Sequence, residues 1–486
     1  MEDEEGLNNR RFRILKDAKG HGKSIQLRLE GFLHEDKGEP ENNVEAPSIT
    51  STSERGRNDD KGCSEGMLEK ILSKDNMNKA YKKVKANKGA PGIDGMKVEE
   101  LFGYLRQHGE ELRQELLEGR YTPKSVRRKE IPKPDGGKRL LGIPTSIDRV
   151  IQQSIAQVLT PIYEKKFVDN SYGFRPLRDA KQAIRKSKEY LNKGHTWVVD
   201  IDLERYFDTV NHDKLMRIIS KDVKDGRVIS LIRKYLKSGV MVNGVVIETE
   251  EGTPQGGPLS PLLSNIMLHE LDVELTKRGH KFCRYADDCN IYVKSEKSAY
   301  RVMESITKYI EKKLKLKVNS KKSKVVRPWD LKYLGFSFYV KEEKYEIRVH
   351  GKSIKEFKKK LKGETKRSSG RSMAYRLSRI KQIITGWTNY YGIANMKSIA
   401  GSLDGWLRRR IRMCIWKEWK KIKTRYKNLV KLGLNIYKAW EYANTRKGYW
   451  RISNSPILSR TLTNKHLKKM GLTSILETYN LKHEFC

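Results

Sequence analysis

The sequence predicts an α+β body followed by a mostly helical, strongly basic C-terminal part. Residues 151–159 and 180–191 repeat apolar side chains at helical spacing, whereas residues 197–203 alternate apolar and polar side chains as a strand does. Past residue 351 the strand signals fade and helical spacing takes over. Helices and strands mixed in one segment, with helices alone after it, indicate an α+β fold joined to a helical region.

Length and charge narrow the function classes. The 486 residues include 101 Lys and Arg against 60 Asp and Glu, a formal net charge of +41. Length alone predicts about two to four domains, and so much positive charge requires an anionic partner, of which nucleic acid is the leading candidate. With 37% hydrophobic residues the chain can also bury sizeable cores. These values exclude an ordinary one-domain metabolic enzyme and a disordered basic coat.

Charge and aromatic residues are distributed unevenly along the chain. Residues 1–66 hold 11 basic and 15 acidic residues with little helical or strand periodicity, so we expect a flexible acidic leader there. Residues 351–486 hold 33 basic and 7 acidic residues together with six of the eight tryptophans. A region that is both basic and aromatic is typical of nucleic-acid binding, because cations contact phosphates and aromatic rings stack on bases.

The sequence gives no sign of export or of a membrane span. Residues 1–5 lack the basic and apolar regions of a signal peptide, and no apolar run approaches the roughly 18 residues that a membrane span needs. The five cysteines are scattered, odd in number and never spaced as C-x-x-C. We therefore expect an intracellular protein with reduced thiols.

Two acidic segments carry the candidate chemistry. In residues 197–204 the side chains of Asp200, Asp202 and Glu204 fall on one face of the predicted strand, opposite an apolar face. A half-exposed surface strand would give the same pattern, so this segment alone does not indicate catalysis.

The second acidic segment is residues 282–293, in which two β-prone runs flank the adjacent pair Asp287 and Asp288. The pattern predicts a hairpin with carboxylates at its tip. Neighbouring carboxylates repel each other in a low dielectric, so keeping both ionised favours a bound cation, and hard oxygen ligands suit Mg²⁺ or Mn²⁺. A solvated Asp-Asp turn is the alternative interpretation.

Several further motifs occur in order around these acidic segments, and together they give the chain a family resemblance. Tyr285-Ala286-Asp287-Asp288 matches the reverse-transcriptase signature, and the wider pattern resembles the reverse transcriptase/maturase encoded by bacterial group II introns. The resemblance runs from about residue 67 to near the C-terminus. The other motifs that carry it are residues 87–95 (NKGAPGIDG), 131–139 (IPKPDGGKR), 172–176 (YGFRP), 253–261 (TPQGGPLSP) and 333–336 (YLGF).

The resemblance implies a right-hand polymerase of α+β class, with fingers and palm over residues 67–340, a helical thumb or X (maturase) domain over 341–425 and a small DNA-binding region over 426–486. The implied function is RNA-directed DNA synthesis from dNTPs on the parent group II intron RNA, primed by a strand at the DNA target, together with assistance of that intron's splicing. The implied location is the cytoplasm, at the nucleoid when the protein acts on DNA.

Site residues follow from the resemblance by position. Asp202 and Asp287 resemble the family's metal ligands, with Asp288 as the partner of Asp287, and the expected cofactor is two Mg²⁺ ions, with Mn²⁺ possible. The aromatic residue that excludes a 2′-hydroxyl is expected to be Phe207, with Tyr206 as the alternative. The expected dNTP-binding residues are these two aromatic residues together with Gln255, Lys133, Lys138 and Arg139, although a solvated basic hairpin is the other interpretation of Lys138.

The basic C-terminal region contributes candidate RNA contacts. A predicted helix places Leu403, Leu407, Ile411 and Ile415 on one face, and Arg408, Arg409 and Arg412 elsewhere, where they contact either RNA or only solvent. No cluster of histidines with paired cysteines, as an HNH endonuclease requires, occurs late in the sequence. The chain therefore resembles the endonuclease-lacking, class C-like lineage, which needs a target strand that is already nicked or single-stranded.

Two other functions remain in competition. A splicing-only maturase would be an RNA-binding protein without polymerase activity, but the intact Asp202, Asp287, Asp288 and Gln255 argue against it. A host-adopted reverse transcriptase in phage defence is disfavoured by the matches in the thumb and at the C-terminus.

Overall fold

The computed structural model describes residues 66–132, 137–242, 245–247, 252 and 256–483. The described chain divides into two compact units, and each is built from two segments. Unit 1 takes its residues from Met1–Val158 and Val223–Glu248, and unit 2 from Leu159–Asp222 and Thr249–Cys486.

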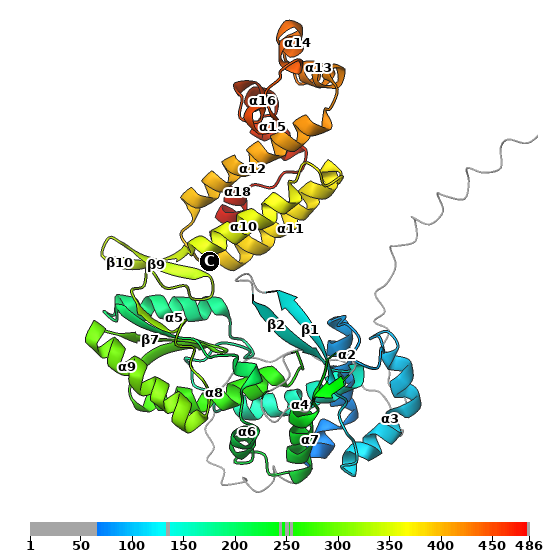
Figure 1. The fold of residues 1–486 in the computed structure, drawn as a ribbon, viewed down its shortest axis with the longest axis vertical. Coiled ribbons are helices and arrows are strands. Elements are labelled where there is room, and N and C mark those ends of the chain that lie inside the picture. Colours follow the sequence, from blue (N-terminus) through cyan, green and yellow to red (C-terminus); the bar gives the residue numbers. More distant parts are fainter. Residues whose placement is uncertain (1–65, 133–136, 243–244, 248–251, 253–255, 484–486) are drawn as a thin grey trace, which may run out of the picture. The chain divides into compact units, whose positions relative to one another are not determined.

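Unit 1 combines helices with a four-stranded sheet of order β2-β1-β4-β5 (Figure 1). β1 and β2 form an antiparallel hairpin in which Pro132 pairs with Lys138, and β4 runs parallel to β1. The elements are α1 (Met67–Ile71), α2 (Lys74–Ala86), α3 (Leu101–Leu117), β1 (Val126–Pro132), β2 (Lys138–Ile143), most of α4 (Ser146–Glu164), α7 (Gly226–Lys237), β4 (Val240–Val242) and β5 (Val245–Ile247).

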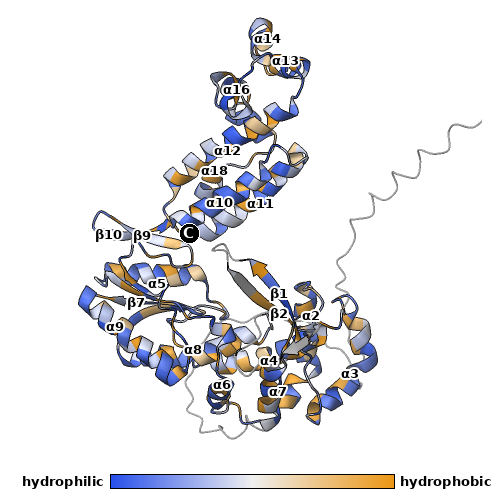
Figure 2. Cartoon of the chain, in the orientation of Figure 1, coloured by the Kyte–Doolittle hydropathy of each residue, from blue (hydrophilic) through white to orange (hydrophobic). Residues whose placement is uncertain are grey.

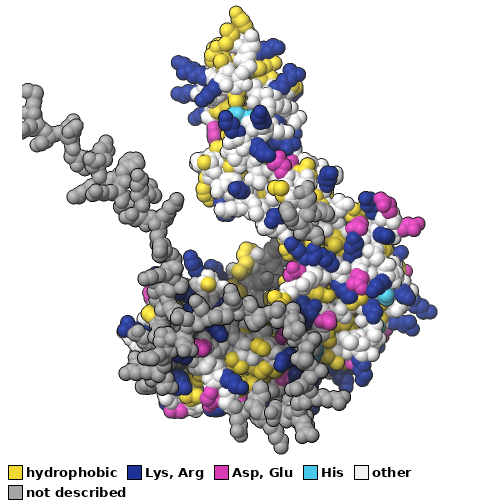
Figure 3. Space-filling view, turned by 180° about the vertical axis from the view of Figure 1, so that it is seen from behind, with side chains coloured by type: hydrophobic (Ala, Val, Ile, Leu, Met, Phe, Trp, Pro, Cys, Tyr) yellow, Lys and Arg dark blue, Asp and Glu magenta, His cyan; other side chains and the backbone are white. Residues whose placement is uncertain are grey.

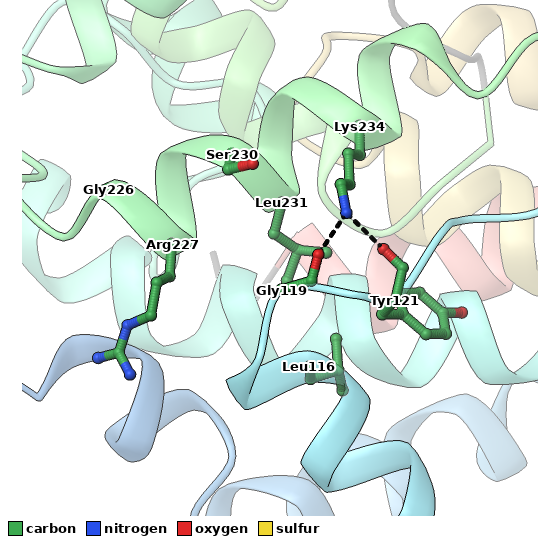
Figure 4. Close-up of a pocket in the computed structure, with 8 residues that line it drawn as sticks. All are labelled: Leu116, Gly119, Tyr121, Gly226, Arg227, Ser230, Leu231 and Lys234. Carbon is green, nitrogen blue, oxygen red and sulfur yellow. Dashed lines mark hydrogen bonds between the residues drawn. The ribbon is translucent and has the colours of Figure 1, made fainter.

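A small cavity of about 190 Å³ in unit 1 is bordered by α3 and α7. Its two cations already have partners. Lys234 Nζ donates to the carbonyl oxygens of Gly119 and Tyr121 at 2.6 and 2.9 Å (Figure 4). Arg227 pairs with Glu69 at 2.7 Å. Both cations are therefore already engaged by hydrogen bonds within the unit.

Unit 2 contains a four-stranded sheet of order β6-β7-β3-β8 and a separate hairpin, β9-β10. The elements of this part are α5 (Ala180–Asn192), β3 (Trp197–Ile201), η2 (Tyr206–Asp208), α6 (His212–Ile219), α8 (Ser260–Lys277), β6 (Lys281–Tyr285), β7 (Asp288–Val293), α9 (Glu296–Tyr309), η3 (Ile310–Leu314), β8 (Lys324–Val326), β9 (Phe336–Lys341) and β10 (Lys344–Val349). Apolar residues of this sheet, such as Val198, Cys283 and Tyr292, share a buried cluster with residues of α5 and β9.

The remainder of unit 2 is helical and has a second buried cluster. Leu403, Leu407, Ile411 and Ile415 of α12 are all buried in it, which confirms the predicted apolar face, and blue and orange positions alternate along α12 (Figure 2). The helices are α10 (Gly351–Glu364), α11 (Met373–Tyr391), α12 (Lys397–Glu418), α13 (Ile422–Lys431), α14 (Ile436–Ala443), α15 (Tyr449–Ile452), α16 (Pro456–Thr461), α17 (Asn464–Lys469) and α18 (Ile475–His483).

The structure confirms the α+β prediction. α4 and α5 include the two predicted helices at residues 151–159 and 180–191, and β3 begins at the predicted strand's first residue but ends at Ile201. Three described cysteines, Cys283, Cys289 and Cys414, are buried with free thiols. Among the described residues, none of the helices is both long and apolar enough to cross a membrane.

Candidate functional site

The two acidic segments lie on adjacent strands of the unit 2 sheet. β3 lies between β7 and β8, and Asp200 of β3 pairs with Asn290 on one side and Lys324 on the other. The β3–β7 register runs antiparallel to Ile201 opposite Cys289. Asp202 directly follows Ile201 and Asp288 directly precedes Cys289, so acidic residues far apart in the sequence come to the same end of the sheet.

The hairpin tip is a tight turn. Tyr285 at the end of β6 pairs with Asp288 at the start of β7, which leaves Ala286 and Asp287 as the connecting residues. Ala286 has a φ of 58°, a backbone conformation that residues with a side chain rarely adopt. Such strain persists only where the surrounding structure enforces it.

A buried arginine enforces the turn. Arg284 is fully buried, and its guanidinium donates to Asp272 Oδ1 at 2.7 Å, Asn265 Oδ1 at 3.0 Å and the carbonyl oxygen of Ala286 at 2.9 Å. Asp272 and Asn265 both belong to α8. The arginine therefore ties the strained turn residue to a helix that packs behind the hairpin.

A glycine permits a neighbouring segment to lie directly on the tip. A Cβ added to Gly173 would be 2.2 Å from the backbone nitrogen of Ala286, far inside any tolerated contact. The segment is fixed there because Tyr172 N donates to Arg284 O at 2.9 Å and Asn265 Nδ2 donates to Gly173 O at 2.8 Å. The motif at residues 172–176 thus supports the hairpin through its backbone.

The acidic side chains perturb one another. Burial raises the pKa of Asp288 well above its usual range, and the charges of Asp200, Asp287 and Asp202 raise it further. Burial also raises the pKa of Asp200 to about 6; Lys324 opposes this shift and Asp202 adds to it. Carboxylates that disfavour each other's ionisation form a site that a cation would stabilise.

The donor set suits a hard divalent cation, since the ligands on offer are carboxylate oxygens. Within the described parts of the chain, no three His, Cys, Asp or Glu side chains are arranged to hold one ion in this conformation. Asp202 Oδ2 lies 3.8 Å from Lys322 Nζ, and the Asp202 side chain is 43% exposed. The residues fit the chemistry of a divalent metal site, whereas their present arrangement is not a closed ligand cage.

The two candidate aromatic residues after Asp202 have different environments. Tyr206 is buried, and its hydroxyl donates to the carbonyl oxygen of Ser264 at 3.1 Å. Phe207 is only half-buried, and its ring packs edge-on against Tyr206 at 5.2 Å. In this conformation Phe207, not Tyr206, has surface available to a sugar.

The residues expected to contact the triphosphate are described only in part. Lys133 and Gln255 lie outside the described residues. Lys138 and Arg139 lie on β2 of unit 1, where the backbone alone is described. Gly252, three residues before Gln255 in the sequence, has a φ of 97°; its nitrogen donates to Val210 O at 2.8 Å, and a Cβ added there would lie 2.9 Å from Phe207 O.

The three arginines of α12 divide by their contacts. Arg412 donates through Nε and Nη2 to the carbonyl oxygen of Leu462 at 3.1 and 3.0 Å, and Arg409 Nη2 donates to Trp450 O at 3.1 Å. Arg408 makes no side-chain hydrogen bond or ion pair to a described residue. Two of the three expected RNA contacts therefore hold neighbouring helices in place.

Several residues that build the site have no role predicted from the sequence. Arg284 is a charged residue inside an apolar strand next to the acidic motif, and that misplaced charge was the available signal. Gly173 belonged to a recognised motif, but only the packing shows what its missing side chain allows. For Asn265 and Asp272, in the middle of a helix, the sequence gave no signal.

Comparison with known families identifies two successive regions. Residues 131–338 match the family model described as reverse transcriptase (RNA-dependent DNA polymerase). Residues 354–433 match the model described as group II intron, maturase-specific domain. The first region includes all four aspartates of the candidate site, and the second includes most of α10 and all of α11, α12 and α13.

Individual proteins are also similar to this chain. Protein YkfC of Escherichia coli is 37% identical over 54% of this chain and 80% of its own length. The group II intron-encoded protein LtrA of Lactococcus lactis is 37% identical over 51% of this chain but only 40% of its own length. A solved structure of apo telomerase from Candida tropicalis is more distant, with 14% identity, a TM-score of 0.38 and coverage of 47% of this chain and 55% of that chain.

Proposed function

The chain belongs to the family of group II intron-encoded reverse transcriptases and maturases, and we propose that it copies its parent intron RNA into DNA at a DNA target site. Members of this family are RNA-directed DNA polymerases and maturases, and the chain has their right-hand polymerase fold. Intron RNA is a partner of such proteins. The DNA target, the primer strand and the individual site residues are part of the proposal.

The observation that carries the proposal is that Asp202, Asp287 and Asp288 lie near one end of a sheet, where burial raises the pKa of Asp288 and the charges of Asp200, Asp287 and Asp202 raise it further. Reverse transcriptases generally use divalent metal ions, and we assign Asp202, Asp287 and Asp288 as the residues that hold two Mg²⁺. When bound, such ions activate a 3′-hydroxyl nucleophile and offset negative charge during displacement at a phosphate.

The protein's own residues contribute orientation and selection. The network of Arg284, Asp272 and Asn265 holds the hairpin tip rigid, so that Asp287 and Asp288 keep a fixed geometry. We propose that the half-buried Phe207 excludes a 2′-hydroxyl. For Lys133, Lys138, Arg139 and Gln255 we propose contacts to the incoming dNTP.

The helical part of unit 2 is the proposed maturase region. We assign residues 341–425 to the thumb or X domain and residues 426–486 to DNA contact. On the face seen in Figure 3, Lys and Arg side chains are spread over this part with few acidic ones between them, an arrangement that suits phosphate binding.

Primer extension tests the proposal. An RNA template with an annealed DNA primer, dNTPs and Mg²⁺ should give full-length product with the unaltered protein and none with Asp287→Ala. Glu296→Gln is the matched control, because it removes an exposed carboxylate at the start of α9. Filter binding with the same RNA should show similar affinity for all three proteins.

Two results would count against the proposal. Extension by Asp287→Ala at the normal rate would refute the metal assignment. Tight RNA binding by the unaltered protein without any extension would favour the splicing-only maturase.

A further inference from the structure

A basic cavity lies in the helical part of unit 2, where residues of the proposed thumb lie beside Trp450 of the region assigned to DNA contact. Its volume is about 570 Å³, within the range of roughly 300–1,000 Å³ that is common for ligand sites. It is bordered by the C-terminal end of α10, the segment that follows it, α12 and α15. The residues that carry the argument are Lys362, Lys366, Arg367, Arg410, Lys417 and Trp450.

The charge of this cavity is of one sign. Five of these six residues are cationic, and no carboxylate is among the described residues that line the cavity. Glu364, which lies in the sequence between the lining residues Lys362 and Lys366, is already paired with Arg371 at 2.7 Å. Like charges gathered around a hollow repel each other and create a positive potential that attracts an anion.

The walls are fixed before any ligand arrives. Arg410 donates through Nη2 to the carbonyl oxygen of Thr365 at 2.9 Å, and Arg376 donates to the carbonyl oxygens of Glu364 and Lys366 at 2.9 and 2.8 Å. The bond from Arg410 holds the segment after α10 against α12, and those from Arg376 hold it against α11. A preorganised wall loses little conformational entropy on binding.

An aromatic surface borders the same cavity. Trp450 is 40% exposed, and the guanidinium of Arg409 lies 3.8 Å from its ring centroid while donating to the Trp450 carbonyl oxygen. The indole ring is thus held in place, and part of its surface stays accessible to a ligand. A fixed aromatic ring beside several cations matches the needs of a nucleotide whose base stacks and whose phosphates seek charge.

We infer that this cavity binds an unpaired nucleotide segment of RNA, with phosphates on Lys366 and Lys417 and a base on Trp450. This inference deepens the proposed RNA-binding function, on which it rests. A base in a duplex is already stacked on its neighbours, so a paired strand would use the cations alone.

A binding experiment on the full chain, without dNTPs, tests the inference. It compares the affinity for a fluorescein-labelled oligo(U) of ten nucleotides with the affinity for a ten-base-pair RNA duplex. Lys366→Gln/Lys417→Gln should weaken oligo(U) binding at least tenfold and make the slope of log affinity against log salt shallower by about 1.4, since each single-strand phosphate contact contributes about 0.7. Trp450→Leu should weaken oligo(U) binding about 5- to 150-fold and duplex binding much less.

The matched control is Lys359→Gln/Lys360→Gln, which removes two exposed lysines of the same helix, α10, that do not line the cavity. Equal losses in the two double variants would overturn the inference, and so would unchanged oligo(U) binding by Trp450→Leu in a protein with an unaltered Tm. Because only binding is measured, the result is independent of whether the protein extends primers.

Discussion

Arg284 and Asp272 form an ion pair in which both side chains are completely buried. Arg284 lies one residue before the Tyr285-Ala286-Asp287-Asp288 motif, and Asp272 lies on α8. The pair is completed by bonds from Arg284 to Asn265, Ala286 and Ser171. A buried arginine with all these partners couples the position of the acidic hairpin to the helix behind it.

Breaking this pair should destabilise unit 2. Asp272→Asn leaves the Arg284 charge buried without its counter-ion, which typically costs about 3–5 kcal/mol. We expect a clear fall in Tm by calorimetry. Lys308→Gln, in the exposed Lys308–Glu304 pair, is the control and should leave Tm nearly unchanged. An equal Tm for both variants would contradict the role of the buried pair.

Gly173 should be intolerant of any side chain. Gly173→Ala places a methyl group 2.2 Å from the backbone nitrogen of Ala286, so the hairpin tip must shift. A displacement of about 1 Å at a reacting group can reduce the rate about 100-fold, and we expect kcat for primer extension to fall on that scale. Gly386→Ala, in a helix with no atom near the added methyl group, should retain normal kcat.

Substitutions of Phe207 and Tyr206 should have different effects on the selection of deoxyribonucleotides over ribonucleotides. Phe207→Ala opens room beside the nucleotide, so incorporation of ribonucleotides relative to deoxyribonucleotides should rise about tenfold or more. Tyr206→Phe removes only the hydroxyl that donates to Ser264 and should leave the ratio unchanged. The ratio is measured from kcat/KM for matched dNTP and rNTP. A change in Tyr206→Phe alone would reverse the assignment.

The acidic site should make stability depend on pH and metal. The pKa of Asp200 in the fold is about 6, above the value of about 3.9 in an unfolded chain. Its contribution to stability is therefore fully present below about pH 3.9 and is lost as the pH rises through about 6. In EDTA, Asp200→Asn should flatten the fall of Tm between pH 4 and 7.

Added Mg²⁺ should act in the opposite direction. Metal binds the deprotonated carboxylates, so it should raise Tm more at pH 7 than at pH 5. An identical effect of Mg²⁺ at both pH values, or in Asp287→Ala, would argue against a metal site at these residues.

Substitutions of Arg412 and Arg408 in α12 should affect different properties, stability in one case and RNA binding in the other. Arg412→Gln loses two bonds to the carbonyl oxygen of Leu462 and should lower Tm. Arg408→Gln should leave Tm unchanged but weaken RNA binding and reduce its salt dependence. Filter binding over a salt series, with Tm measured in parallel, checks both. Reversed phenotypes would show that Arg412 is the RNA contact.

The sequence predicted much of the fold because the local patterns were strong. The strand over residues 197–203 and the hairpin at 282–293 were visible from alternation and β-prone runs, and both form as expected apart from the end of β3. The apolar face of α12 was equally clear. Helical and strand periods reflect burial on one face, so they survive in the sequence without knowledge of partners.

Roles that depend on distant partners were not visible. The arginines of α12 look alike in sequence, yet only tertiary contacts distinguish Arg412, which bonds to Leu462, from Arg408. Tyr206 and Phe207 are adjacent and similar, and the short 3₁₀ turn η2 decides which one is buried.

The sequence by itself determined that a basic α+β chain with two acidic segments and an ordered set of motifs belongs among reverse transcriptases. The tertiary structure alone decided that Asp200 and Asp202 meet Asp288, that a buried Arg284 holds the hairpin tip, and that cations from α10 and α12 surround one cavity with Trp450. The physical reason is that composition and periodicity are local, whereas charge repulsion, buried ion pairs and cavities arise between residues that only folding brings together.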